Sequence, residues 1–143
     1  MQAARIGTYS CGDGHPLVLI AGPCVLENEA LTMELAGLLR DIVEPLPVQL
    51  VFKASFDKAN RTHIDSYRGP GIDAGLAMLQ AVRDQLEIPV TTDIHEPSQA
   101  MPAAQTCELL QIPAFLARQT DLLTAAAKSG AAINVKKLSL IHI

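Results

Sequence analysis

One segment in the first half of the sequence carries side chains suited to binding a phosphorylated, hydroxyl-rich small molecule. Residues 51–62 combine three cations with three hydrogen-bonding groups: Lys53, Lys58 and Arg61, and Ser55, Asp57 and Asn60. Cations bind phosphate oxygens, and short polar side chains bind hydroxyl groups. The segment begins as an apolar strand and continues as a polar loop, so the expected chemistry lies where a strand ends.

Strand-like apolar runs alternate with helix-like segments along the rest of the chain. We expect strands at residues 17–21, 49–53, 88–93, 108–112 and 132–136, and helices at 27–43, 72–86, just after Pro97 and Ser98, and at 119–128. This alternation with short connections is typical of a parallel sheet with right-handed crossovers. The uninterrupted apolar run at 17–21 predicts a strand buried on both faces. A Gly-Asp-Gly turn at 12–14 indicates a short amino-terminal extension or hairpin before it.

Polar side chains collect at the expected carboxyl ends of the strands: Cys24, Lys53, Asp93, Gln111 and Lys136. Ligands bind at this end in (β/α)₈ barrels and also in doubly wound sheets, so the pattern alone does not choose between them. The first strand is not followed by Gly-x-Gly-x-x-Gly, which disfavours a dinucleotide site. A complete barrel needs about 250 residues. With 143 residues, we expect either an open sheet or an incomplete barrel.

The composition narrows the class of protein. The hydrophobic fraction of 49% is sufficient for one domain with a buried core, and the formal net charge of −4 disfavours nucleic acid as a partner. The three cysteines are an odd number without CxxC spacing, which fits a reducing cytoplasm better than a disulfide framework. Apolar runs stay short of the roughly 20 residues of a membrane span.

The last residues depart from the rhythm of the chain. Residues 138–143 contain no turn or helix start, and they resemble the translation of an adapter end. We therefore expect a partial barrel domain at residues 1–137, followed by a non-native tail at 138–143.

Several long segments are similar to the 3-deoxy-D-manno-octulosonate 8-phosphate synthase family. The similarity runs from about residue 5 to residue 137, and it is carried by residues 21–24, 52–62, 66–71, 92–97, 111–122 and 134–137. Related heptulosonate phosphate synthases typically have Lys-Pro-Arg-Thr-Ser where this chain has Lys58-Ala59-Asn60-Arg61-Thr62. This difference favours the octulosonate family.

The resemblance implies a fold, a reaction and partners. The fold is a homotetrameric (β/α)₈ TIM barrel, of which this chain would hold about the first five strands. The enzymes condense phosphoenolpyruvate with D-arabinose 5-phosphate and water, release phosphate, and supply cytoplasmic lipopolysaccharide biosynthesis. A chain that stops after five strands would be inactive alone.

The resemblance also implies roles for individual residues. Phosphoenolpyruvate would meet Lys53, Lys136, Gln111, Arg118 and the backbone near Ala114. The sugar phosphate would contact Lys58, Asn60, Arg61, Thr62 and Asp93, and Ser55 would be a further substrate-binding residue. Catalytic roles would fall to Lys136 as a proton donor, to Asp93 and to Asn60. Simpler interpretations stay open: Gln111 as a satisfied core glutamine, Lys58 as a solvated loop charge, and Lys53 reaching solvent.

Cys24 occupies the position that, in the similar family, separates metal-dependent from metal-independent enzymes. In the family, one class has asparagine at this position and needs no metal, and the other has cysteine and binds a divalent ion such as Zn, Fe or Mn. Cys24 therefore resembles the metal-dependent class, whose remaining histidine, glutamate and aspartate ligands would come from later strands, outside this chain. The simpler interpretation is a small buried hydrophobe. We interpret His95 as a structural or supporting residue.

Two other functions remain as alternatives. The chain could belong to a sibling aldol-type synthase, such as a 3-deoxy-7-phosphoheptulonate (DAHP) or sialic acid synthase. It could also be a non-catalytic phosphate-binding α/β module, which would fold cooperatively as a monomer.

Overall fold

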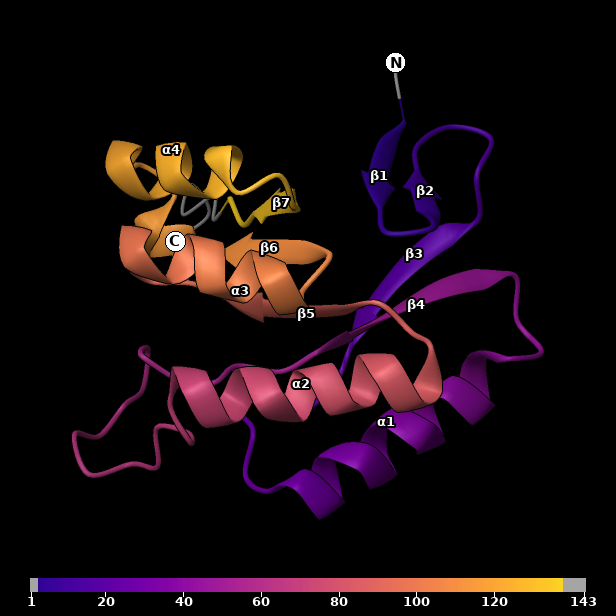
Figure 1. The fold of residues 1–143 in the computed structure, drawn as a ribbon, viewed down its shortest axis with the longest axis horizontal. Helices are drawn as coiled ribbons and strands as arrows, with labels where there is room; N and C mark the ends of the chain where they lie inside the picture. Colours follow the sequence, from indigo (N-terminus) through magenta and orange to yellow (C-terminus); the bar gives the residue numbers. More distant parts are fainter. Residues whose placement is uncertain (1–2, 138–143) are drawn as a thin grey trace.

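A single parallel sheet runs through the molecule, and its strands lie side by side in chain order (Figure 1). The computed structural model describes residues 3–137. The sheet consists of β3 (Leu17–Ala21), β4 (Val48–Lys53), β5 (Val90–Asp93), β6 (Leu109–Ile112) and β7 (Ala132–Val135). Because each strand is added beside the previous one, the sheet winds in one direction, without the reversal of a doubly wound fold. The expected partial (β/α)₈ barrel is confirmed.

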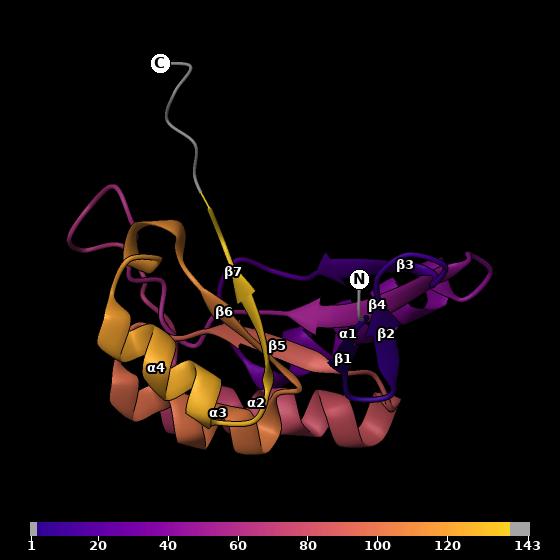
Figure 2. The ribbon, with the colours of Figure 1, turned by 90° about the horizontal axis from the view of Figure 1, so that it is seen from above.

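The helices form one layer on one face of this sheet (Figure 2). They are α1 (Glu29–Val43), α2 (Ile72–Leu86), α3 (Ala100–Thr106) and α4 (Thr120–Lys128), with short 3₁₀ turns η1 (Pro97–Gln99) and η2 (Ala114–Leu116). Each α-helix contacts the next one along the chain. Asn28 starts α1, because its side chain accepts a hydrogen bond from the Leu31 N–H at 2.9 Å.

The main core lies between the helices and the outer face of the sheet. Leu50 and Phe52 of β4 and Leu110 of β6 are buried there against Leu79 of α2 and Leu122 of α4. Strand side chains alternate between faces, so the neighbouring positions in the same strands point inward. This alternation leaves Val51, Lys53, Leu109 and Gln111 on the concave side.

An antiparallel hairpin, β1 (Ala4–Ile6) and β2 (Tyr9–Cys11), covers the concave face near the amino ends of the strands. Ile6 packs with Val51 and Leu109. The Gln49 side chain fixes the hairpin by donating to the carbonyls of Ser10 and Pro16, both at 2.9 Å. The expected hairpin is thus present, and its chain reverses at Gly7, which has φ 56°. The expected turn at residues 12–14 is also present: it follows β2, and the His15 N–H donates to the Gly12 carbonyl at 3.2 Å.

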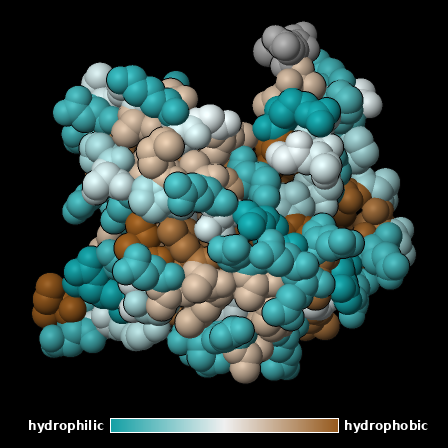
Figure 3. Space-filling view, in the orientation of Figure 1, coloured by the Kyte–Doolittle hydropathy of each residue, from teal (hydrophilic) through white to brown (hydrophobic). Residues whose placement is uncertain are grey.

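The expected burial of residues 17–21 on both faces is wrong. Leu17 is 69% exposed and Ile20 is 38% exposed. Within residues 3–137, β3 pairs only with β4 and β7 only with β6, so both are edge strands. The periodic apolar stripe of α1 is also partly open, since Leu38 and Ile42 are exposed. Figure 3 shows that apolar patches reach the surface between polar regions on one face of the molecule.

Two other expectations concern the ends of the chain and membranes. The suggested tail at residues 138–143 lies outside the described residues. Among the residues described, no helix is long and apolar enough to cross a membrane.

The packing of α2 on the loop after β4 predicts opposite effects for two helical glycines. A Cβ at Gly75 would lie 2.4 Å from Phe56 Cβ, whereas a Cβ at Gly37 in α1 would meet nothing within 4 Å. Alanine is favoured over glycine in helices by about 1 kcal/mol, and overpacking costs about 1–3 kcal/mol. We expect Gly37→Ala to raise the free energy of unfolding and Gly75→Ala to lower it, measured by urea denaturation. Equal stabilisation by both would contradict the close approach of α2 to Phe56.

Candidate functional site

A cavity of about 240 Å³ opens at the carboxyl ends of the strands. Side chains from every strand end of the sheet reach it, together with the loop after β4. Its lining residues are Cys24, Lys53, Ser55, Lys58, Ala59, Asn60, Asp93, His95, Gln111, Pro113, Ala114, Phe115 and Lys136. We call this cavity the strand-end pocket.

The strand register explains why distant residues meet here. Lys53 pairs with Thr91 in the ladder, Asp93 pairs with Gln111, and Gln111 pairs with Asn134. Residues opposite one another in adjacent strands point to the same face. The side chain of Asn134 donates to Gln111 Oε1 at 3.3 Å, so Gln111 is held by a neighbour and also lines the pocket.

An ion pair lies at the floor of the strand-end pocket. The distance from Lys53 Nζ to Asp93 Oδ1 is 3.3 Å, and both side chains are mostly buried. Lys53 Nζ also donates to Ser55 Oγ at 2.7 Å, and Ser55 Oγ donates to Asp93 Oδ1. The charge of Lys53 is therefore compensated within the protein, and this compensation offsets the desolvation cost of burying it.

Asp93 is held ionised by its surroundings. Burial by itself would raise the pKa of this carboxyl, but the hydrogen bond from His95, the charge of Lys53 and the hydrogen bond from Ser55 outweigh it. Together they lower the pKa of Asp93 from 3.8 to about 2. An ionised carboxylate accepts hydrogen bonds, so Asp93 can bind hydroxyl groups of a ligand.

Gly22 allows Cys24 to approach the pocket. A Cβ on Gly22 would lie 2.0 Å from the Lys53 carbonyl oxygen, so only glycine fits at this crossing. Beyond it, the Ser55 N–H donates to the Cys24 carbonyl at 3.3 Å, and the Leu26 N–H donates to the Ser55 carbonyl at 3.0 Å. The loop after β3 thus runs beside the end of β4, and the Cys24 thiol is exposed at the pocket.

An ion pair closes the base of the loop after β4. Arg68 donates two hydrogen bonds to the Asp57 carboxylate, at 2.9 and 2.6 Å. The hydrogen bond from Arg68 is the main cause of the lowered pKa of Asp57. The Lys58 N–H donates to the Arg68 carbonyl at 2.5 Å. These contacts fix the point at which Lys58 and Asn60 enter the strand-end pocket.

The pocket is a cationic site. Lys53, Lys58 and Lys136 line it against one carboxylate, Asp93. Within residues 3–137, neither Lys58 nor Lys136 forms an ion pair. Three cations around a small cavity favour a ligand with several negative charges.

Most residues expected at the site meet in this one pocket, and three do not line it. Arg118 and Thr62 are exposed and lie outside it. Arg61 turns back on its own loop and donates to the carbonyls of Ala59 at 3.2 Å and Ile64 at 3.4 Å. Four lining residues were not among the expected ligands: Ala59, His95, Pro113 and Phe115. The position of His95 two residues after Asp93 was a signal for its proximity, since both follow β5.

The described residues do not complete a metal site. Residues 3–137 contain no group of three or more His, Cys, Asp or Glu side chains that could hold a metal ion. Cys24 offers a single thiol, which is fewer than the three or four protein ligands of ordinary zinc sites. Cys107, by contrast, is buried, and burial raises the pKa of its thiol to about 12.

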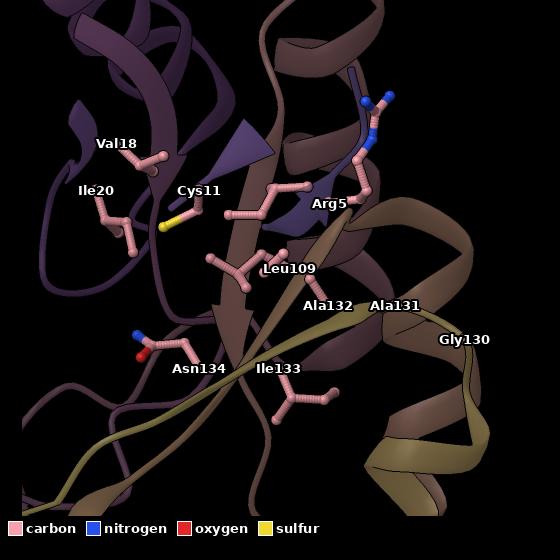
Figure 4. A pocket seen from close by; sticks show the side chains of 12 residues that line it. Arg5, Cys11, Val18, Ile20, Leu109, Gly130, Ala131, Ala132, Ile133 and Asn134 are labelled. Carbon is pink, nitrogen blue, oxygen red and sulfur yellow. The ribbon is translucent and has the colours of Figure 1, made fainter. Parts of the chain in front are cut away.

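A second cavity, of about 460 Å³, lies on the concave face between the hairpin and β7 (Figure 4). Val18, Ile20, Leu109 and Ile133 line it with mostly apolar surface. It lacks a convergent set of charged groups, so its chemistry suits packing rather than catalysis.

Comparisons with known proteins give one family. The DAHP synthetase I family matches residues 2–141. A 2-dehydro-3-deoxyphosphooctonate aldolase of Desulfatibacillum aliphaticivorans is 60% identical over 136 residues, which are 91% of this chain and 50% of the relative. Enzymes of the same name from Syntrophotalea carbinolica and a Synechococcus strain are 53% and 54% identical, over 93% and 95% of this chain and 48% and 49% of the relatives. The chain thus spans about half the length of the curated relatives it matches.

The lowered pKa of Asp93 predicts a defined acid sensitivity. A carboxyl whose pKa is depressed on folding stabilises the protein above its unfolded pKa, and the contribution is lost as the pH falls through the folded pKa. For Asp93 this window runs from 3.8 down to about 2. As the pH falls through this window, we expect the free energy of unfolding of the wild type to decrease by on the order of 2 kcal/mol more than that of Asp93→Asn. Urea denaturation at each pH measures both values. Parallel losses in both proteins would contradict the ionised, stabilised carboxylate.

Proposed function

This chain belongs to the DAHP synthetase I family, and we propose that it forms half of an enzyme that condenses phosphoenolpyruvate with D-arabinose 5-phosphate and water. The products would be 3-deoxy-D-manno-octulosonate 8-phosphate and phosphate. The names of the relatives support this assignment, since all three are 2-dehydro-3-deoxyphosphooctonate aldolases. The reaction would serve lipopolysaccharide biosynthesis in the cytoplasm.

The observation that carries the proposal is the strand-end pocket itself. Lys53, Lys58 and Lys136 surround one cavity that also contains the Asp93 carboxylate and the Asn60 amide. A phosphorylated acid and a phosphorylated sugar repel each other, and cations near both would offset this repulsion. The carboxylate and amide suit the sugar hydroxyls. Holding two substrates in one orientation would supply much of the rate enhancement.

The half of the binding site that holds phosphoenolpyruvate would be formed at the carboxyl ends of β4, β6 and β7. Lys53 and Lys136 would bind its negative groups, and Gln111 and the backbone near Ala114 would position them. All four residues line the pocket. Binding would draw Lys53 from its pair with Asp93 toward the substrate. Arg118 lies outside the pocket in this chain, so its proposed contact needs movement of the segment before α4 or a site shared between subunits.

The sugar phosphate half would be formed by the loop after β4. Lys58 and Asn60 would hold the sugar, and Asp93 and Ser55 would bind its hydroxyls. Arg61 and Thr62 would bind the phosphate at the outer end of the loop. Arg61 now donates to carbonyls of its own loop at 3.2 to 3.4 Å, which are long bonds that a phosphate would replace with stronger, charge-assisted ones.

The proposed chemistry makes one carbon–carbon bond. The methylene carbon of phosphoenolpyruvate attacks the aldehyde carbon of the open-chain sugar, and the aldehyde oxygen takes up a proton. Water adds to the neighbouring carbon of the former double bond, after which the carbon–oxygen bond to phosphate breaks. Lys136 would donate a proton in this sequence. Asn60 and Asp93 would keep the aldehyde oriented toward the attacking carbon.

We extend the proposal to a divalent metal, such as Zn, Fe or Mn, held by Cys24 and by ligands from outside this chain. The support is chemical: an exposed thiol reaches the same pocket as the substrate ligands, and thiolates bind zinc and ferrous iron well. A homotetramer is part of the same proposal. Exposed Phe115 at the mouth of the pocket fits burial against a neighbouring subunit.

Substrate choice tests the proposed function directly. We expect the full-length protein that carries this chain to release phosphate from phosphoenolpyruvate with D-arabinose 5-phosphate, and to be at least about 100-fold less efficient with erythrose 4-phosphate. The measurement is kcat/KM for each sugar phosphate. Preference for erythrose 4-phosphate would assign the chain to the heptulosonate enzymes instead.

A matched pair of lysine variants locates the site in the same assay. Lys136→Met should lower kcat/KM by about 100-fold or more, because it removes a cation from the pocket. Lys128→Met, on the exposed last turn of α4, should leave it unchanged. Equal activities of the two variants would contradict the strand-end pocket as the site.

Cys24 gives a separate prediction about the metal. In the full-length protein, a chelator should abolish the activity of wild type and of Cys11→Ser, because Cys11 lies on the hairpin. Cys24→Asn should bind less metal, because an amide cannot replace a thiolate ligand. It should keep its activity in the chelator, because the family class that has asparagine at this position needs no metal. Elemental analysis and activity assays check both points. Unchanged chelator sensitivity of Cys24→Asn would contradict the assignment of Cys24 as a ligand.

A further inference from the structure

Within residues 3–137, the His95 side chain makes one polar contact, and that contact is with Asp93. The distance from His95 Nε2 to Asp93 Oδ2 is 3.0 Å, and each side chain is 12% exposed. The other oxygen, Oδ1, receives Ser55 Oγ and lies near Lys53 Nζ. Both carboxylate oxygens of Asp93 therefore have polar partners. Those at Oδ1 come from the end of β4 and the residues just after it, and the one at Oδ2 comes from the segment after β5.

The imidazole is itself fixed in place. The backbone N–H of His95 donates to Gln99 Oε1 at 2.7 Å, which ties the residue to the start of α3. Its ring packs edge-to-face on Phe56, with centroids 6.3 Å apart and an interplanar angle of 81°. Nδ1 is buried and has no hydrogen-bond partner within residues 3–137. The ring is thus oriented by packing on one side and by Asp93 on the other.

The direction of the hydrogen bond follows from the charge of the partner. An ionised carboxylate only accepts hydrogen bonds, so Nε2 carries the proton and donates it to Asp93 Oδ2. In metal sites, neighbours of this kind fix the orientation of the ligating side chains, and their loss costs about 10- to 100-fold in metal affinity or activity. We expect a cost of similar size where a neighbour orients a substrate-binding carboxylate.

We infer that His95 is a positioning residue, which holds the Asp93 carboxylate in the orientation that binds the hydroxyl groups of the sugar phosphate. This inference rests on the proposed function. A carboxylate fixed only at Oδ1 can rotate about its χ2 torsion, and the donor at Oδ2 removes that freedom. Asp93 lines the strand-end pocket, where a ligand's hydroxyl groups can donate to the lone pairs of the carboxylate that remain free.

The inference predicts a selective effect on one substrate. In the full-length protein, His95→Phe keeps the ring packing on Phe56 but removes the donor. We expect it to raise KM for D-arabinose 5-phosphate by about 10-fold or more, with KM for phosphoenolpyruvate changed by less than about 2-fold. His95→Gln places an amide N–H near the position of Nε2, and it should restore the sugar KM to within about 3-fold of wild type.

Two controls separate positioning from general damage. His15→Phe, an exposed substitution near the hairpin, should leave both KM values unchanged. In an Asp93→Asn background, His95→Phe should add no further loss of affinity for the sugar phosphate in calorimetric titrations, because coupled residues are not additive. Additive losses, a parallel rise of both KM values, or a His95→Gln variant as impaired as His95→Phe would overturn the inference. A wild-type protein without condensation activity would instead overturn the proposed function, and this inference with it.

Discussion

The burial of Lys53 beside Asp93, at the ends of two adjacent strands, is the constraint on which the site depends. Each charge would be costly to bury alone, and removal of either partner leaves the other uncompensated. Ser55 bridges the pair from β4, and His95 holds the far oxygen of the carboxylate. The same arrangement keeps Asp93 ionised. It also leaves two further lysines of the pocket, Lys58 and Lys136, without an internal partner in the described chain, so the pocket retains net positive charge for an anionic ligand.

The fold supplies this arrangement through the direction of its winding. Parallel strands in chain order bring every carboxyl end to the same side of the sheet, and the hairpin covers the opposite end of the concave face. Two local features then refine the positions. Gly22 lets the loop that carries Cys24 cross close to β4, and the pair between Asp57 and Arg68 closes the base of the loop that carries Lys58. The described part of the molecule therefore contains both halves of the proposed substrate-binding site, but only one proposed metal ligand.

The sequence predicted the strands, the helices and the polar strand ends, because these follow from apolar periodicity and from the positions of Gly and Pro. It could not predict exposure at Leu17 and Ile20, because an apolar run looks the same whether or not a further strand covers it. It also gave no indication that Arg61 turns toward its own loop, since side-chain direction depends on contacts across the fold. The sequence also could not predict the contact between His95 and Asp93. Their spacing indicates that the two residues lie near each other, but it does not give the orientation of their side chains.

A crystal structure of the full-length protein with phosphoenolpyruvate and D-arabinose 5-phosphate bound tests the central claim most directly. The account predicts that both substrates occupy the strand-end pocket, with the acid contacting Lys53 and Lys136 and the sugar hydroxyls contacting Asp93. Substrates bound elsewhere, with Lys53 and Asp93 still paired and the pocket filled only by solvent, would contradict it.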